Sequence, residues 1–137
     1  MRAVPRSATA GRVDAALESV GLQQQARQRL STLSGGMTRR AAIAQALLAD
    51  PAVLLLDEST TGLDPLQRAE IRLLLRSLAT SRCVVLASHI VEDIEQLATR
   101  VSVLHRGRVL FDGATDDLAG TSGLESGFIS LIGGDAA

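Results

Sequence analysis

The sequence predicts an α/β fold in which a parallel sheet is flanked by helices. Two short apolar runs, residues 53–56 and 83–87, have the length of buried strands and are too short for helices. The residues between them, 65–78, repeat leucine and isoleucine at helical spacing. A helix between two strands returns the chain to the same end of the sheet, so the strands should be parallel neighbours.

The composition fits one domain with a modest core. The chain has 137 residues and a formal net charge of −1, so no basic surface for a nucleic acid is expected. Its only aromatic residues, Phe111 and Phe128, are too few for a base-stacking platform. No apolar run has the length of a membrane span, and the first residues lack a secretory signal pattern. We therefore expect a cytoplasmic protein without a nucleic-acid partner, and we expect Cys83 to be a core residue.

Helices are predicted for most of the first 50 residues, after an irregular lead-in over residues 1–11. One helix is expected over residues 12–20, where the apolar side chains fall on one face. The polar residues 23–29 should form a solvated surface, and a second helix is expected after Ser34. We assign residues 12–50 to a helical subdomain.

The second predicted helix begins with Ser34-Gly35-Gly36-Met37. Ser34 is placed to cap this helix, and the two glycines remove side chains from its first turn. Bare backbone N–H groups at the positive end of a helix dipole suit a phosphate. The same kind of cap is common in helices that bind nothing, so taken alone it does not identify a site.

Two carboxylates, Asp57 and Glu58, follow the first predicted strand. They stand where a strand buried on both faces must meet water, at the carboxyl edge of the sheet, and open α/β sheets bind ligands at that edge. The ordinary alternative is a strand end with two solvated acids. Beyond them, Asp64 and Pro65 suit the N-cap and the first position of the next helix.

The second predicted strand is followed by Ser88-His89. If the two strands are parallel, His89 should emerge on the same edge as Asp57 and Glu58. A single histidine at a strand end is most often structural, but beside two acids it becomes a candidate reactive group.

The rest of the chain completes an α/β core that we assign to residues 51–118. A helix is predicted over residues 91–99, a hairpin over residues 101–111 and one helical turn over residues 115–118. No regular pattern is evident in residues 119–137, which we treat as a tail.

Together, four of these segments resemble successive motifs of the ABC transporter ATPases, in the family's order. Residues 33–37 resemble the signature loop, and the strand that ends in Asp57-Glu58 resembles the Walker B strand with its catalytic glutamate. Residues 61–64 resemble the D-loop, and His89 resembles the switch histidine. Each fragment is weak alone, whereas the ordered set is specific. The resemblance is greatest to the branch that drives multidrug or ABC-2-type export.

The resemblance covers residues 12–118 and implies a partial P-loop NTPase fold. That fold would be a parallel sheet flanked by helices, with part of the helical signature subdomain and without the N-terminal phosphate-loop half. The implied function is that of an ATPase subunit which converts ATP and water to ADP and phosphate, uses Mg²⁺, and is coupled to membrane transport. The implied partners are a second ATPase domain, in a head-to-tail homo- or heterodimer, and a membrane permease that holds the protein at the inner face of the cell membrane.

The resemblance also implies roles for single residues. Asp57 would hold Mg²⁺ through water, and Glu58 would polarise or deprotonate the attacking water. His89 would hydrogen-bond the γ-phosphate and orient that water, and Asp64 would couple the two sites of the dimer. The signature residues that would close over ATP bound to the opposing subunit are Ser34, Gly35, Gly36 and Met37.

Three departures from the family's pattern stand out. Met37 occupies the usual position of a glutamine, and Ser59 occupies that of a proline. No G-x-x-x-x-G-K-[S/T] loop is present, and the chain contains no lysine with which to build one. The chain therefore resembles the C-terminal half of a nucleotide-binding domain, and we expect it to bind MgATP poorly alone.

Two other functions stay open at this point. A non-catalytic interaction or regulatory module could keep the signature helix and pair with a complete ATPase. A non-functional truncated product would expose apolar sheet edges and would tend to aggregate.

Overall fold

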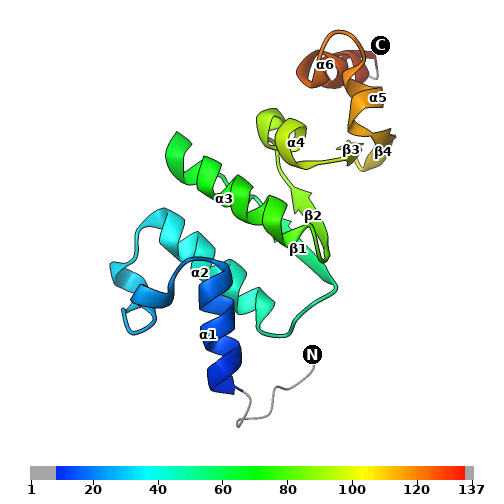
Figure 1. Ribbon diagram of the computed structural model, residues 1–137. Coiled ribbons are helices and arrows are strands. Elements are labelled where there is room, and N and C mark those ends of the chain that lie inside the picture. The colour runs from blue at the N-terminus through cyan, green and yellow to red at the C-terminus, as the bar shows by residue number, and fades with distance from the viewer. Residues whose placement is uncertain (1–8, 135–137) are drawn as a thin grey trace. The chain divides into compact units, whose positions relative to one another are not determined.

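The structure is a computed structural model, and it describes residues 9–134. The chain forms two compact units, one ending at Ala87 and the other beginning at Ser88. The first unit contains α1 (Thr9–Ser19), the 3₁₀ turns η2 (Gln23–Gln25) and η3 (Leu30–Thr32), α2 (Gly35–Leu47), β1 (Val53–Asp57), α3 (Pro65–Leu78) and β2 (Cys83–Ala87). The second unit contains α4 (Val91–Leu97), β3 (Arg100–His105), β4 (Arg108–Ala114), α5 (Thr115–Ala119) and α6 (Leu124–Gly134), as labelled in Figure 1.

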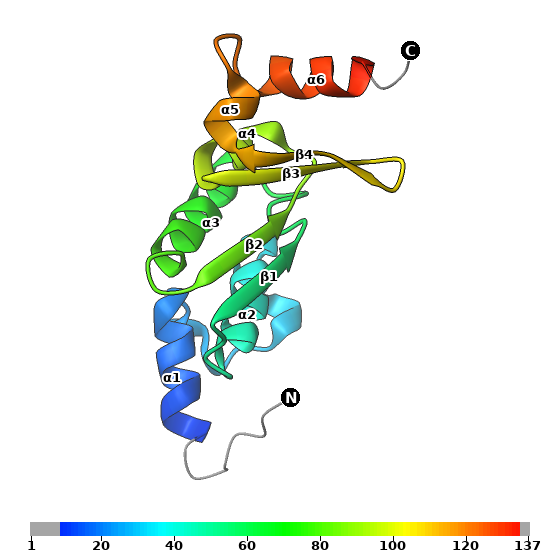
Figure 2. The same ribbon diagram turned by 90° about the vertical axis from the view of Figure 1, so that its right-hand side faces the viewer.

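The parallel strand pair that the sequence predicts is present in the first unit. β1 pairs with β2 in parallel, with Val53 opposite Cys83 and Asp57 opposite Ala87. Figure 2 shows the two strands side by side, with α2 and α3 behind them. α3 connects the strands, so the predicted strand, helix, strand order of an α/β fold is confirmed.

The core of the first unit is built mainly from the predicted helix stripes. The side chains of Ile71, Leu75 and Leu78 on α3 are buried, as their spacing predicts. On α2, Ile43 and Ala44 are buried. The remaining buried apolar side chains of this unit are Ala16, Val20, Leu22, Leu54 and Leu63.

The prediction that β1 is buried on both faces is wrong. Leu54 is 2% exposed, whereas Val53 is 52% and Leu55 is 72% exposed. On β2, Val85 is 47% exposed, and Cys83, which we expected in the core, is exposed. Among the residues that the structure describes, β1 and β2 are the only strands of their sheet, and α2 and α3 lie on one side of it, so the other side meets solvent. We call this surface, formed by Val53, Leu55, Cys83 and Val85, the open face.

The predicted hairpin is present in the second unit. β3 and β4 are antiparallel, and the turn residues Arg106 and Gly107 both have positive φ, 46° and 77°, which suits the twist of a two-residue hairpin. Across the hairpin, Arg100 Nη2 donates to Asp112 Oδ2 at 2.9 Å, and this hydrogen bond lowers the pKa of the Asp112 carboxyl. Both side chains are exposed, so the ion pair contributes little to stability.

A helix stands where we predicted a tail without regular structure. α6 covers Leu124–Gly134, and Leu124 is buried. The helix packs against α5. The presence of α5 over Thr115–Ala119 confirms the helical turn predicted at residues 115–118. Tertiary packing of this kind stabilises short helices whose local sequence favours them weakly.

The two compact units divide at Ala87, inside the segment 51–118 that we assigned to one core. This division does not test the predicted domain limits, which stay predictions. Of the predicted lead-in, residues 1–8 lie outside the described residues, and α1 already begins at Thr9. No helix within residues 9–134 combines the length and the apolar character needed to cross a membrane.

Candidate functional site

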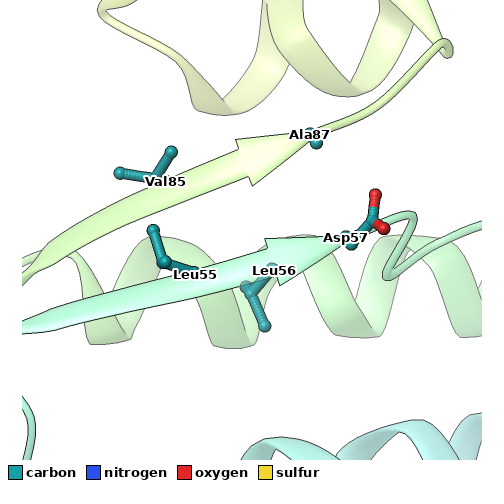
Figure 3. A pocket seen from close by; sticks show the side chains of 5 residues that line it. All are labelled: Leu55, Leu56, Asp57, Val85 and Ala87. Carbon is teal, nitrogen blue, oxygen red and sulfur yellow. The ribbon is translucent and has the colours of Figure 1, made fainter.

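Asp57 lies at the carboxyl end of the parallel strand pair. It is the last residue of β1, opposite Ala87, and its side chain is exposed. A shallow depression of about 210 Å³ lies here (Figure 3), and it is lined by Leu55, Leu56, Asp57, Val85 and Ala87. A carboxylate at the open end of a strand can reach a ligand without a change in the fold.

Glu58 turns the chain out of the sheet in an unusual backbone conformation. Its φ is +49°, in the left-handed region that residues other than glycine seldom adopt. Its N–H donates to the carbonyl of Ala87 at 2.9 Å, which ties the residue to β2. The Thr61 hydroxyl donates to Glu58 Oε2 at 2.6 Å, a short charge-assisted hydrogen bond. The first contact fixes the backbone of this half-buried residue at the strand end, and the second fixes its carboxylate. Backbone strain of this kind is common at functional sites.

The predicted cap of the signature helix is confirmed. The Ser34 hydroxyl accepts from the N–H of Met37 at 3.2 Å, and the Ser34 carbonyl accepts from the N–H of Thr38 at 2.8 Å, the first helical bond of α2. The first residue of the helix, Gly35, is exposed. The N–H groups of a first helical turn have no partner within the helix, so this end offers donors to an anion.

The D-loop segment, residues 61–64, lies against the start of α2. Asp64 caps α3 by accepting from the N–H of Gln67 at 2.9 Å, as predicted, and its side chain is exposed. Leu63 is buried, and Arg39 Nη2 of α2 donates to the carbonyl of Thr61 at 3.5 Å. The structure therefore brings residues 61–64 and the start of α2 together.

His89 follows β2 and is exposed, and it belongs to the second compact unit. The Ser88 hydroxyl accepts from the N–H of Ile90 at 3.1 Å, which shapes the entry to α4. Because the two units are described separately, the predicted meeting of His89 with Asp57 and Glu58 stays a prediction.

The carboxylate oxygens at the end of β1 fit the way in which Mg²⁺ binds in nucleotide sites. Within residues 9–134, no three histidine, cysteine or acidic side chains are grouped so that they could hold a metal ion. Mg²⁺ with a nucleotide is usually held by one or two carboxylates, with phosphates and water completing its shell. The exposed carboxylate of Asp57 meets that requirement, and the chemistry that the ion would supply is neutralisation of phosphate charge.

Two features of the site escaped the sequence analysis. Thr61 hydrogen-bonds Glu58 from three residues further on, and a threonine in a turn is the only signal that could have suggested it. Ser59, which stands where the family usually has proline, is 3% exposed, and its hydroxyl finds no hydrogen-bond partner in the described part of the chain. A buried hydroxyl without a partner destabilises the folded state, which a proline at this position would not do.

Comparison with known proteins identifies relatives of most of the chain. The family model described as ABC transporter matches residues 3–61. The bacitracin transport ATP-binding protein BcrA of Bacillus licheniformis is 43% identical over 108 residues, 77% of this chain and 35% of BcrA. The methionine import ATP-binding protein MetN 2 of Rhodopseudomonas palustris is 44% identical over 117 residues, 84% of this chain and 31% of that protein.

A solved structure supports the same relationship. CbiO1 from Clostridium perfringens, described as part of the ABC transporter complex cbiONQ, superposes with a TM-score of 0.76 at 32% sequence identity. The superposition covers 84% of this chain and 47% of CbiO1. The chain thus spans about a third of the length of the curated relatives that it matches, and about half of this solved chain. From its motifs, sequence relatives and fold, we conclude that the chain belongs to the ABC transporter ATP-binding family, of whose ATP-binding domain it spans a part.

Proposed function

We propose that this chain contributes one half of an ATP-hydrolysing site to an ABC transporter. It would supply the Walker B carboxylates, the D-loop, the switch histidine and the signature turn, and another polypeptide segment would supply the glycine-rich phosphate loop. The observation that carries this proposal is the geometry of Glu58. Its backbone is tied to the carboxyl end of the parallel strand pair by the carbonyl of Ala87, and its carboxylate accepts from the Thr61 hydroxyl.

The proposed chemistry is phosphoryl transfer to water. Asp57 would hold Mg²⁺, Glu58 would take a proton from the attacking water or polarise it, and His89 would orient that water against the γ-phosphate. In such reactions the protein mainly positions groups and stabilises charge. A carboxylate that accepts from Thr61 and stands on a backbone tied to Ala87 suits this task, because it need not reorganise when the reaction begins.

The proposed partners follow from the family. Ser34, Gly35, Gly36 and Met37 would close over ATP bound to a second ATPase domain, with Asp64 coupling the two sites. A membrane permease would hold the assembly at the inner face of the cell membrane. The transport branch that we propose is multidrug or ABC-2-type export, and no nucleic acid is expected to bind.

The open face supports the proposal that another segment completes the domain. Leu55 and Val85 project from the same side of the strands, opposite to Leu56 (Figure 3), and they are 72% and 47% exposed. Contiguous apolar side chains on a sheet surface are costly to leave in water. The matched part of this chain covers only 35% and 31% of the two curated relatives, so a segment long enough to cover the face exists in them.

The first test measures nucleotide binding by isothermal titration calorimetry. The chain alone should show no MgATP binding tighter than about 100 µM, because it has no phosphate loop and no lysine to grip the β- and γ-phosphates. The reconstituted pair, this chain produced together with a polypeptide that carries the phosphate loop of an ABC ATPase, should bind MgATP in the micromolar range. Micromolar binding by the chain alone would contradict the proposed division of the site.

A second prediction concerns the thiol of Cys83, the only cysteine in the chain. Because Cys83 is exposed on the open face, a maleimide reagent should modify it readily in the isolated chain. In the reconstituted pair, the rate of modification should fall by about tenfold or more, because the thiol reacts only when the covered face opens. Mass spectrometry measures the rate, and Cys83→Ser is the unreactive control. Equal rates before and after pairing would show that the face stays uncovered.

The absence of a phosphate loop also favours one alternative. A chain that lacks this loop could serve as a non-catalytic module which pairs with a complete ATPase through its signature helix and D-loop. The two functions differ in what Glu58 does, and a substitution at that residue distinguishes them.

A further inference from the structure

The two glycines at the start of α2 have different surroundings. A Cβ atom built on Gly35 would lie 3.8 Å from Leu63 Cδ2, an ordinary contact, and Gly35 is exposed. Gly36 is buried, and a Cβ atom there would lie 3.2 Å from both Cγ and Cδ of Gln67 and 3.4 Å from its Cβ. Neither glycine has a positive φ, so the backbone conformation does not require glycine at either position. A methyl group at residue 36 would crowd Gln67, whose side chain would have to shift to admit it.

Gln67 is itself held in place by the D-loop. It is the third residue of α3, and its N–H donates to Asp64 Oδ1 at 2.9 Å. One turn further along both helices, Arg40 Nη2 lies 3.2 Å from Glu70 Oε2. These contacts lay the first turns of α2 and α3 against each other, with the Gln67 side chain next to Gly36.

We infer that Gln67 is a positioning residue for the signature turn, residues 33–37, and acts through its contact with Gly36. This inference rests on the proposed function, in which the signature turn closes over a nucleotide held by another ATPase domain. The N–H groups at the start of α2 can meet a phosphate only if the helix stands at a fixed place relative to the D-loop. The Gln67 side chain sets that place through Cγ and Cδ, the atoms nearest to Gly36, and the amide nitrogen and oxygen are not required for the contact.

The packing is tested on the isolated chain by thermal unfolding. Gly36→Ala should lower the unfolding midpoint by about 3 to 10 °C relative to Gly35→Ala, because only the methyl group at residue 36 meets a neighbour closer than 3.4 Å. The comparison between two glycines of one turn removes the general gain in helix propensity on changing glycine to alanine. In a Gln67→Ala background, the difference between the two variants should disappear. A difference that persists without the Gln67 side chain would overturn the inference.

The functional role is tested in the reconstituted pair by steady-state ATP turnover. Gln67→Ala should lower kcat by about 3- to 10-fold, because the donors at the start of α2 lose their fixed position, while the unfolding midpoint of the chain stays the same or rises. Gln67→Met keeps the length of the side chain without its amide and should restore kcat. Unchanged kcat in Gln67→Ala, or failure of Gln67→Met to restore it, would overturn the role of the side-chain stem.

The two measurements also separate this inference from the proposed function. If the pair containing the unmodified chain hydrolyses no ATP, the proposed function fails, and so does the functional part of the inference. The unfolding midpoints would still decide whether Gln67 fixes Gly36, because they need neither nucleotide nor partner.

Discussion

Glu58→Gln should lower the ATP turnover of the reconstituted pair by at least about 100-fold, the usual contribution of a positioned general base. The amide has almost the same shape as the carboxylate but cannot take a proton from water. Its oxygen can still accept from the Thr61 hydroxyl, which lies 2.6 Å from Glu58 Oε2, and the backbone bond to Ala87 is unaffected. The substitution therefore removes the chemical role and leaves the local structure in place.

The measurement is phosphate release at saturating MgATP, with nucleotide affinity determined separately by calorimetry. Affinity should be preserved in Glu58→Gln, because Glu58 acts on water and not on the nucleotide. Glu125→Gln is the matched control, since Glu125 is exposed at the start of α6, in the other compact unit. Equal turnover in the Glu58→Gln pair and the unmodified pair would favour the non-catalytic interaction module.

The caps and turns of this fold could be predicted from local sequence, since their causes are local. Ser34 and Asp64 each accept from the N–H three residues further on, as N-caps do. Gly107 permits the hairpin turn because glycine tolerates positive φ. The candidate site was predictable to the same extent, because Asp57 and Glu58 follow directly from the end of a strand.

Burial could not be predicted from the same patterns, because it depends on what lies over a residue in three dimensions. The apolar run of β1 indicates two covered faces, yet Leu55 is 72% exposed and Leu54 is 2% exposed. Cys83 sits in an equally apolar run and is exposed as well. The sequence pattern is that of a strand inside a larger sheet, which is the situation that we propose for the completed domain.

Contacts between side chains distant in sequence were also beyond prediction. Gly36 and Gln67 lie in the first turns of two helices that begin 30 residues apart in the sequence. The spacing of apolar residues within each helix does not predict this contact. Thr61 is nearer to its partner, and the turn closed by its N–H on the Glu58 carbonyl at 3.3 Å accompanies the contact between hydroxyl and carboxylate. The sequence thus predicts each helix and strand separately, but the contacts that position side chains of the candidate site depend on how these elements pack together.

Ile71→Ala should lower the free energy of unfolding of the chain by about 3 kcal/mol, within the range of about 2 to 5 kcal/mol for isoleucine in a core. Ile71 is 1% exposed and lies in the middle of α3, so the substitution leaves a cavity that the surrounding side chains can fill only in part. Domains of this size are stable by only about 5 to 15 kcal/mol, and one cavity can therefore unfold a large fraction of the molecules.

The matched control is Leu73→Ala, on the same helix and 64% exposed, which should change stability by less than about 0.5 kcal/mol. Urea unfolding followed by circular dichroism measures both variants, and equal losses would show that α3 does not pack as described. The result also bears on the site, because α3 begins at the D-loop and carries Gln67 in its first turn. If Ile71 anchors α3, then pairs containing Ile71→Ala should lose turnover as the chain unfolds, whereas pairs containing Glu58→Gln should lose it while the chain stays folded.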